Sequence, residues 1–239
     1  MTEELFREDA YLKSCRAEVV SADDDGIQLN RTIFYPLGGG QPGDTGVLVR
    51  GSGEELSIVD TRKDRTTGAH LHIAEKGSEL PMPGETVEAR IDWERRHRLM
   101  RMHSCMHLLC ALIPAGVTGG SVRDGSARLD FDLPQPPDRQ EIEMALNRLI
   151  TGDHRMSQRW ISDDELDARP ELVRTMSVQP PRGAGRVRLV EFEGVDLQPC
   201  GGTHVASTGE IGPVVVKKIE KKGKKNRRIT IEFASNENR

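Results

Sequence analysis

The chain has 239 residues, of which 30% are charged and 36% hydrophobic, and its formal net charge at pH 7 is −4. This length suffices for one large or two small domains with a buried core, and the low net charge argues against global disorder. The apolar stretches are too short to cross a bilayer, and the acidic N-terminal segment lacks the pattern of a signal peptide. We therefore expect a cytoplasmic protein without membrane contact. Four irregularly spaced cysteines predict reduced thiols or metal ligands, not a disulfide framework.

The first 93 residues alternate between short apolar runs and turns rich in glycine and proline. This pattern predicts a small antiparallel β-barrel. The clearest run places Val87, Ala89, Ile91 and Trp93 on one face of a strand. The predicted strands cover residues 19–20, 27–29, 46–49, 56–59, 70–73 and 86–93.

Helical periodicity begins at residue 94, where Leu99, Met102, Met106 and Leu109 recur at helical spacing up to about residue 113. We therefore expect two domains, residues 1–93 and residues 94–239. The second domain should contain strands at 127–132, 186–192, 212–219 and 228–233, a helix from a cap at Asp138 to about residue 151, and a short helix opened by a capping box of Ser162 and Glu165. The whole chain is predicted to be α+β, with an antiparallel sheet in the second domain.

Two pairs of side chains carry metal-binding chemistry. His103 and His107 are four residues apart in the predicted helix, so both imidazoles lie on one face. Cys200 and His204 flank a turn whose glycines allow both side chains to point at one site. Three imidazoles and one thiolate suit Zn²⁺ and not a hard cation such as Mg²⁺. The alternative is a core cysteine near an unrelated histidine.

Two further segments are less specific. Residues 31–46 contain five glycines and two prolines, which predict a tight loop able to approach a ligand or simply to connect two strands. Residues 217–228 contain eight Lys or Arg and one Glu, and the segment 90–101 is also rich in arginine. Such strips either bind a polyanion or form a solvated surface.

Together these segments resemble the AlaX family, free-standing relatives of the editing domain of alanyl-tRNA synthetase. The resemblance rests on TIFYP from Thr32, GGGQPGDTG from Gly38, HSCMHLL from His103 and CGGTHV from Cys200, in the family's order along nearly the whole chain. The sequence ARLDF from Ala127 and the basic strip also match. One departure is Cys105, where relatives often carry a smaller residue. It faces away from the two histidines, so we do not count it as a ligand.

The resemblance implies an aminoacyl-tRNA hydrolase that acts in translation fidelity without ATP. Its substrate would be tRNA(Ala) carrying serine or glycine, and its cofactor one zinc ion per chain, held by His103, His107, Cys200 and His204. A synthetase pocket for alanine cannot strongly reject serine, so a second, hydrolytic site that demands the hydroxyl is needed. The implied substrate-binding residues are Thr32, Gln41, Gly39 and Gly40, and the implied tRNA-binding residues are Lys221, Lys222, Lys224, Lys225, Arg227 and Arg228.

Several alternatives stay open at this point. Thr32 can instead be an ordinary strand residue. The zinc can activate water or only position the substrate, and the oligomeric state is either monomer or homodimer. The chain can also be a non-catalytic, zinc-stabilised tRNA-binding module, or a deacylase for another mischarged tRNA. The sequence CGGTH favours the alanine branch over the threonine branch, whose pattern carries Pro before the last His.

Overall fold

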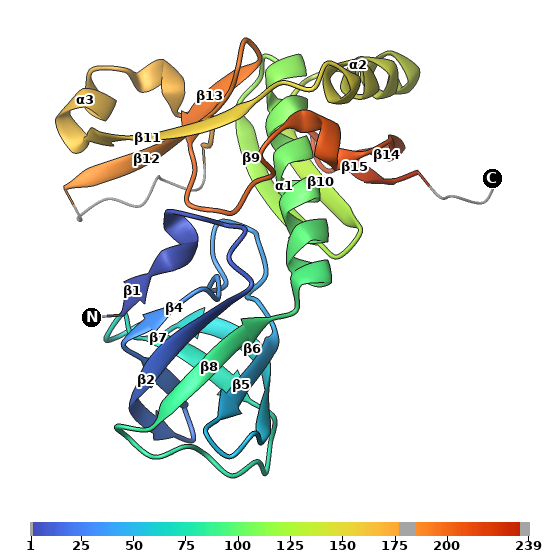
Figure 1. The fold of residues 1–239 in the computed structure, drawn as a ribbon. Helices are drawn as coiled ribbons and strands as arrows, with labels where there is room; N and C mark the ends of the chain where they lie inside the picture. The colour runs from blue at the N-terminus through green and yellow to red at the C-terminus, as the bar shows by residue number, and fades with distance from the viewer. Residues whose placement is uncertain (1, 177–184, 235–239) are drawn as a thin grey trace. The chain divides into compact units, whose positions relative to one another are not determined.

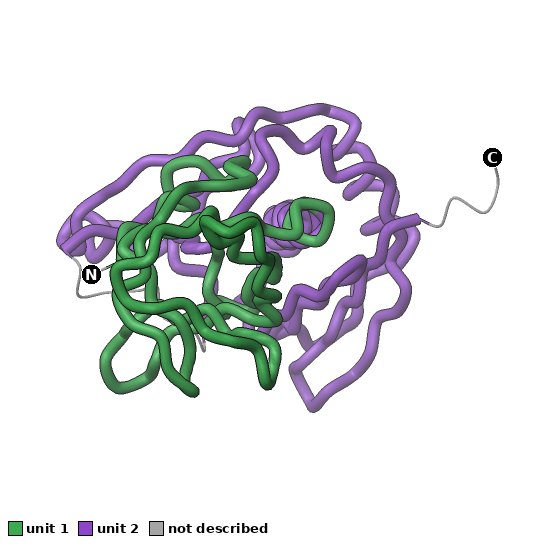
Figure 2. Tube along the Cα trace, turned by 60° about the horizontal axis from the view of Figure 1, so that its bottom comes forward, with its two compact units in different colours: residues 1–97 green, residues 98–239 purple. Residues whose placement is uncertain are grey.

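The computed structural model describes residues 2–176 and 185–234. The chain divides into two compact units, Met1–His97 and Arg98–Arg239 (Figures 1 and 2). The first is built of strands, and the second combines helices with two sheets, so the predicted α+β class is confirmed.

The N-terminal unit is a closed barrel of six antiparallel strands in the order β2-β3-β7-β6-β5-β8, as predicted. Alternate side chains point inward, so that Val87, Ala89 and Ile91 of β8 are all buried. The barrel strands are β2 (Ser14–Asp23), β3 (Gly26–Leu29), β5 (Gly46–Arg50), β6 (Glu55–Lys63), β7 (His70–Ala74) and β8 (Thr86–Ile91). Outside the barrel, β1 (Glu3–Glu4) pairs in parallel with β4 (Arg31–Thr32), and η1 (Leu5–Arg7) is a short 3₁₀ helix.

Helix α1 (Trp93–Leu112) begins at Trp93, which the alternation had assigned to the preceding strand. The reason is local: the Asp92 carboxylate accepts a hydrogen bond from the backbone N–H of Arg95 at 3.0 Å and so caps the new helix. Residues 102–110 of α1 are buried around the whole helix, because strands and loops of the C-terminal unit surround it.

The C-terminal unit contains two antiparallel sheets. A four-stranded sheet has the order β14-β15-β10-β9, and a three-stranded sheet the order β11-β12-β13. The strands are β9 (Val117–Arg123), β10 (Ser126–Asp132), β11 (Met156–Ser162), β12 (Arg186–Phe192), β13 (Asp196–Pro199), β14 (Val214–Lys221) and β15 (Asn226–Phe233). The helices are α2 (Arg139–Thr151) and α3 (Asp163–Asp167), with 3₁₀ turns η2 (Pro170–Leu172) and η3 (Thr208–Ile211).

Both predicted helix starts in this unit are confirmed. The Asp138 side chain accepts hydrogen bonds from the N–H groups of Gln140 and Glu141, and Ser162 and Glu165 form the capping box. Three strands of this unit were not predicted, namely β9, β11 and β13. Two glycines interrupt the apolar pattern of β9, and β11 carries mainly exposed polar side chains, so neither strand shows the usual alternation.

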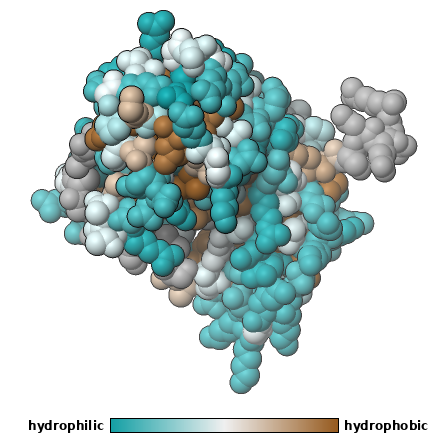
Figure 3. All heavy atoms as spheres, turned by 90° about the horizontal axis from the view of Figure 1, so that it is seen from below, coloured by the Kyte–Doolittle hydropathy of each residue, from teal (hydrophilic) through white to brown (hydrophobic). Residues whose placement is uncertain are grey.

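Among the described residues, no helix combines the length and apolar character that crossing a bilayer requires. The large apolar side chains that are exposed are scattered along the chain, from Val20 to Met176. Figure 3 shows a face on which hydrophilic residues dominate.

Candidate metal centre

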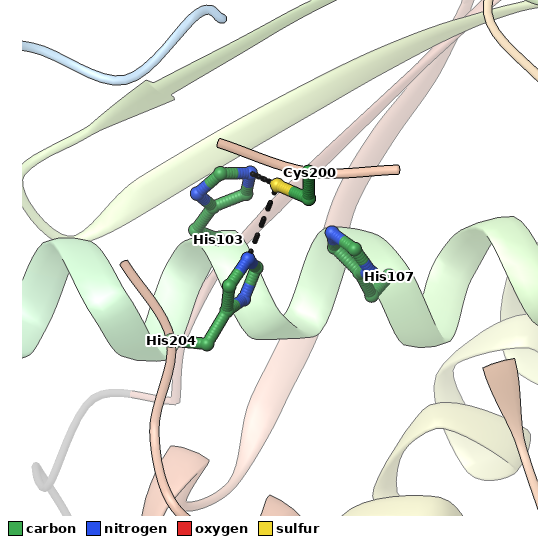
Figure 4. A group of neighbouring side chains, drawn as sticks. All are labelled: His103, His107, Cys200 and His204. Atoms are coloured by element: carbon green, nitrogen blue, oxygen red, sulfur yellow. Dashed lines mark hydrogen bonds between the residues drawn. The ribbon is translucent and has the colours of Figure 1, made fainter. Parts of the chain in front are cut away.

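The four predicted metal ligands lie together in the C-terminal unit. One donor atom from each of His103, His107, Cys200 and His204 lies within 4.8 Å of the others. Cys200 Sγ is 3.2 Å from His204 Nε2 and 3.6 Å from His103 Nε2 (Figure 4). Tetrahedral zinc, with bonds of about 2.0–2.3 Å, separates its nitrogen and sulfur ligands by about 3.5 Å. The four side chains therefore have the spacing of a metal site.

Two elements bring these ligands together. Helix α1 carries His103 and His107 one turn apart, and the segment after β13 carries Cys200 and His204. The Arg188 side chain fixes this segment, because Nη1 donates to the Gly202 carbonyl at 2.7 Å while the backbone N–H of Cys200 donates to the Arg188 carbonyl at 3.0 Å. Both the side chain and the backbone of Arg188, on the neighbouring strand β12, therefore hold the turn in place.

Polar side chains behind the histidines orient the rings. With Nδ1 as the donor, His107 bonds to Asp196 Oδ2 at 2.9 Å, and Gln198 Nε2 donates to the same oxygen at 2.7 Å. His204 Nδ1 lies 3.1 Å from Ser104 Oγ. This arrangement leaves Nε2 of both rings free to bind a metal, a common device in zinc sites.

Sequence reasoning missed Asp196, Gln198 and the role of Ser104. The available signal was the alternation in β13, which places Asp196 and Gln198 on one face just before Cys200. Both side chains are buried and point toward the histidine pair. A buried carboxylate two residues from a buried amide, next to a predicted ligand, is the pattern to search for.

The site is buried and rich in soft donors. Burial alone would raise the pKa of the Cys200 thiol, but the neighbouring imidazoles of His103 and His204 hold that pKa well below its ordinary value. Burial lowers the pKa of His107, but hydrogen bonds to Asp196 and Cys200 and the charges of both groups together outweigh this effect and raise the pKa to about 9. The group can hold a metal ion, and a thiolate with three imidazoles fits zinc.

Cys105 is not part of this group, in agreement with the sequence prediction. Its side chain is fully buried on another face of α1, and burial raises the pKa of its thiol to about 12. A thiol that stays protonated and sits away from the histidines is a core residue.

The predicted substrate-binding residues lie in the N-terminal unit. Thr32 is buried, and its Oγ1 lies 2.7 Å from His72 Nε2 and accepts the N–H of Phe34 at 3.0 Å. His72 Nδ1 faces the Ile27 carbonyl at 2.9 Å, so Nδ1 carries the proton and the Thr32 hydroxyl donates to Nε2. His72, which sequence reasoning missed, thereby orients the Thr32 hydroxyl.

The glycine-rich loop contains a tight turn and is held in place by hydrogen bonds. Gly38 and Gln41 exchange two backbone hydrogen bonds, of 3.1 and 2.9 Å, and the positive φ values of Gly39 and Gly40 (57° and 83°) suit the turn between them. Gln41 itself is buried. The loop is anchored by Asp44, whose carboxylate accepts both the Tyr35 N–H and the buried guanidinium of Arg96.

The six predicted tRNA-binding residues fall into two groups. Lys221, Lys222, Lys224 and Lys225 are exposed on the hairpin that joins β14 and β15. Arg227 is buried, and its guanidinium donates to backbone carbonyls of the same hairpin, including Gly223 at 3.1 Å.

Arg228 is half-buried and forms a two-bond ion pair with Asp130, with both distances 2.7 Å. The arginines at the start of α1 are also engaged within their own units, for example Arg98 with Asp124 at 2.6 Å. Arg95 donates to the Gly43 carbonyl, and Arg101 donates to the Ile211 carbonyl and lies over the Phe233 ring.

Two family models match the chain. Residues 187–230 match the "threonyl and alanyl tRNA synthetase second additional domain", the part that contains Cys200 and His204. Residues 8–95 match "tRNA synthetases class II (A)".

Known proteins are similar over nearly the whole chain. The alanyl-tRNA editing protein AlaX-M of Saccharolobus solfataricus is 35% identical over 233 residues, covering 96% of this chain and 98% of its own. AlaX-M of Methanosarcina mazei is 38% identical over 240 residues, which is 96% of this chain and 95% of its own. The alanine–tRNA ligase of Pyrobaculum calidifontis is 34% identical over 235 residues, but only 25% of that protein is covered. The chain therefore belongs to the family of alanyl-tRNA editing proteins of the AlaX-M type.

Proposed function

We propose that this chain hydrolyses, in the cytoplasm, the ester that joins serine or glycine to the 3′ adenosine of tRNA(Ala). The observation that carries the proposal is the buried group of three imidazoles and one thiolate, in a chain similar to alanyl-tRNA editing proteins over its whole length. The names of the relatives indicate the substrate class, an aminoacyl-tRNA, and the four side chains indicate that a metal ion takes part.

One zinc ion would be held by His103, His107, Cys200 and His204. When bound, zinc supplies a Lewis acid that lowers the pKa of a water or anchors the substrate. A thiolate ligand donates charge to the metal and weakens its Lewis acidity, and four protein ligands leave no ready position for water. Both features favour the anchoring role.

The chain's own residues would supply selectivity. The Thr32 hydroxyl donates to His72 and accepts from Phe34 N–H, which leaves one lone pair to accept a further hydrogen bond. A serine hydroxyl can donate that bond and an alanine methyl group cannot. In addition, Gln41 with the backbone of Gly39 and Gly40 would position the aminoacyl group or the terminal adenosine. Because His72 fixes the direction of the Thr32 hydroxyl, the remaining lone pair of its oxygen is oriented before substrate binds.

The four exposed lysines of the β14–β15 hairpin would contact tRNA phosphates. Their side chains reach solvent, whereas Arg227 holds the hairpin in shape and Arg228 is paired with Asp130. Phosphate contacts of this kind position the RNA without reading its sequence.

The decisive experiment compares release of serine from Ser-tRNA(Ala) with release of alanine from Ala-tRNA(Ala), using zinc-loaded and zinc-stripped protein. We expect zinc-dependent loss of serine while Ala-tRNA(Ala) is spared. Gly-tRNA(Ala) and Ser-tRNA(Thr) as further substrates separate a serine editor from a broader deacylase. If every ester survives while the chain still binds tRNA, the protein is a zinc-stabilised binding module and the proposal is wrong.

A further inference from the structure

One face of the four-stranded sheet presents cations and hydroxyls in a fixed pattern. In this antiparallel sheet, residues directly opposite each other point to the same side. One row across the four strands consists of Ser121, Arg128, Thr230 and Lys218, and the next of Gly119, Asp130, Arg228 and Glu220. The intervening residues of β10, Ala127, Leu129 and Phe131, are buried on the other side. We call the side with the polar rows the cationic face.

The ion pairs on the cationic face leave positive charge in excess. Arg128 and Arg228 share the single carboxylate of Asp130, and Lys218 and Lys222 share that of Glu220. Each carboxylate therefore neutralises only one of its two cations.

Arg123, at the end of β9, is exposed and forms no ion pair with any residue that the structure describes. Two further acids lie on this side, because Glu232 is opposite Ser126 and the exposed Asp132 is opposite Asn226; Glu232 is paired with Lys217 at 2.7 Å. Six cations thus face four carboxylates, and the surplus of two positive charges is directed to solvent. The shared carboxylates also hold the guanidinium groups in place, because each is bonded from behind.

The cationic face is hollowed. A depression of about 210 Å³ is lined by the whole first row, by Arg228 and Glu220 of the second row, and by the strand ends, where Arg123 and Ser126 lie. Pockets for drug-sized ligands and cofactors span about 300–1,000 Å³ and are mostly apolar. A smaller depression lined mainly by arginine, lysine and hydroxyl side chains, with Glu220 as its single carboxylate, suits a single anionic group instead, such as a phosphodiester.

We propose that the cationic face binds the phosphate backbone of the tRNA substrate, with Arg123, Arg128 and Lys218 contacting phosphates. Thr230, which lies between Arg128 and Lys218 in the first row, and Ser121 at the end of that row donate hydrogen bonds to phosphate oxygens. The choice of tRNA as the occupant rests on the proposed function. The argument for a polyanion rests on the charge surplus and the depression. Arg123 and Arg128 lie outside the basic strip of residues 217–228, so the RNA path extends from the hairpin onto the sheet.

The test measures binding of a labelled, uncharged tRNA(Ala) transcript by fluorescence anisotropy over a range of salt concentrations. The variant Arg123→Gln/Lys218→Gln removes two cations whose loss leaves Glu220 paired with Lys222. We expect weaker binding and a log–log salt slope that is smaller by about two, one for each phosphate contact removed. The matched control is Arg159→Gln, an exposed arginine on β11 of the other sheet. Circular dichroism and zinc content should not differ between the variants.

A second variant reverses the sign of the effect. Glu220→Gln removes a carboxylate from the cationic face and frees Lys218 and Lys222 for phosphates, so tRNA binding should become several-fold tighter. A purely structural salt-bridge network predicts no such gain.

Unchanged affinity and salt slope in Arg123→Gln/Lys218→Gln would overturn the proposal. Because uncharged tRNA carries no ester, this result is independent of catalysis: a chain that binds as expected but cleaves no ester refutes only the deacylase. A wild-type chain that binds no tRNA refutes both.

Discussion

Asp196 Oδ2 lies 2.9 Å from His107 Nδ1, and both side chains are buried behind the candidate metal centre. The carboxylate fixes the tautomer of the imidazole, so that Nε2 presents its lone pair to the site. Since Gln198 donates to the same carboxylate oxygen, the orientation of Asp196 is itself fixed. A metal ion that binds here displaces the Nε2 proton, but the ring itself needs no reorientation.

Asp196→Asn should therefore weaken zinc binding while all four ligands remain. The amide carries no charge and can turn its NH₂ group toward Nδ1, which favours the wrong tautomer. We expect a loss of about 10- to 100-fold in affinity, as for other residues that support metal ligands. Competition with a chromophoric chelator measures it. The matched control is Asp153→Asn, an exposed aspartate of the same unit, which should bind zinc as tightly as the wild type. Equal affinities in all three proteins would contradict the assigned role.

Cys200→Ala should lose bound zinc, because only three imidazoles remain. The control is Cys105→Ala, two residues from His103 and from His107, which should keep one zinc per chain since Cys105 is a core residue. Elemental analysis of the zinc content of both purified variants tests whether Cys200 is a ligand. Undiminished zinc in folded Cys200→Ala would remove that residue from the ligand set.

Thr32→Val should reduce the preference for Ser-tRNA(Ala) over Ala-tRNA(Ala). A buried hydrogen bond to the serine hydroxyl contributes roughly 1–3 kcal/mol, so the ratio of the two hydrolysis rates should fall about 10- to 100-fold. The ratio is the proper readout because it does not depend on how much of the variant is folded. Thr32→Ser keeps the hydroxyl and should keep the ratio. A preserved ratio in Thr32→Val would make Thr32 an ordinary strand residue.

Asp44→Asn should destabilise the N-terminal unit. Asp44 pairs with the fully buried guanidinium of Arg96, and loss of one partner leaves the other as an uncompensated buried charge. Such a loss costs about 3–5 kcal/mol, whereas an exposed control such as Asp24→Asn should change stability by less than about 0.5 kcal/mol. Urea unfolding in a Trp160→Phe background, where Trp93 is the remaining tryptophan, reports on this unit. Equal midpoints would show that the ion pair contributes nothing net.

The four residues of the candidate metal centre were predictable because their spacing has geometric meaning: four residues along a helix, and a glycine turn between two donors. The supporting residues were missed. The alternation in β13 places Asp196 and Gln198 beside Cys200, but the partner of Asp196, His107, is far away in the sequence, so no local pattern shows that the two side chains meet.

Charge was the least informative signal. Arg96, Arg227 and Arg228 belong to basic segments that suggested RNA contacts, yet each bonds inside the protein. Arg123, Arg128 and Lys218 lie apart in the sequence and come together only through the register of the sheet. The sequence alone does not separate arginines that bond inside the protein from cations that gather on the surface, because whether an arginine contacts a carboxylate depends on the tertiary structure.

The N-terminal unit should lose stability as the pH falls from 7 to 5, because of His72. Burial lowers the pKa of this imidazole to about 3, compared with about 6.5 in the unfolded chain. Between these two pH values the unfolded chain binds a proton on His72 and the folded chain does not. The contribution of His72 to the free energy of unfolding is therefore fully present above pH 6.5 and declines below it. Burial lowers the pKa of the neighbouring His70 as well, which acts in the same direction. For His72 alone, the expected loss between pH 7 and pH 5 is about 2 kcal/mol.

The measurement is urea unfolding of Trp160→Phe at several pH values, followed by Trp93 fluorescence, with and without His72→Gln. Glutamine does not titrate in this range, so the variant should be less stable at pH 7 but should show a pH dependence shallower by up to one proton. Subtracting the two curves removes the contributions of His70 and Glu4, the titratable groups nearest to His72 on β7 and β1. Parallel curves for the two proteins would mean that His72 does not take up a proton on unfolding, and that its contacts with Thr32 and the Ile27 carbonyl do not hold it in the neutral form.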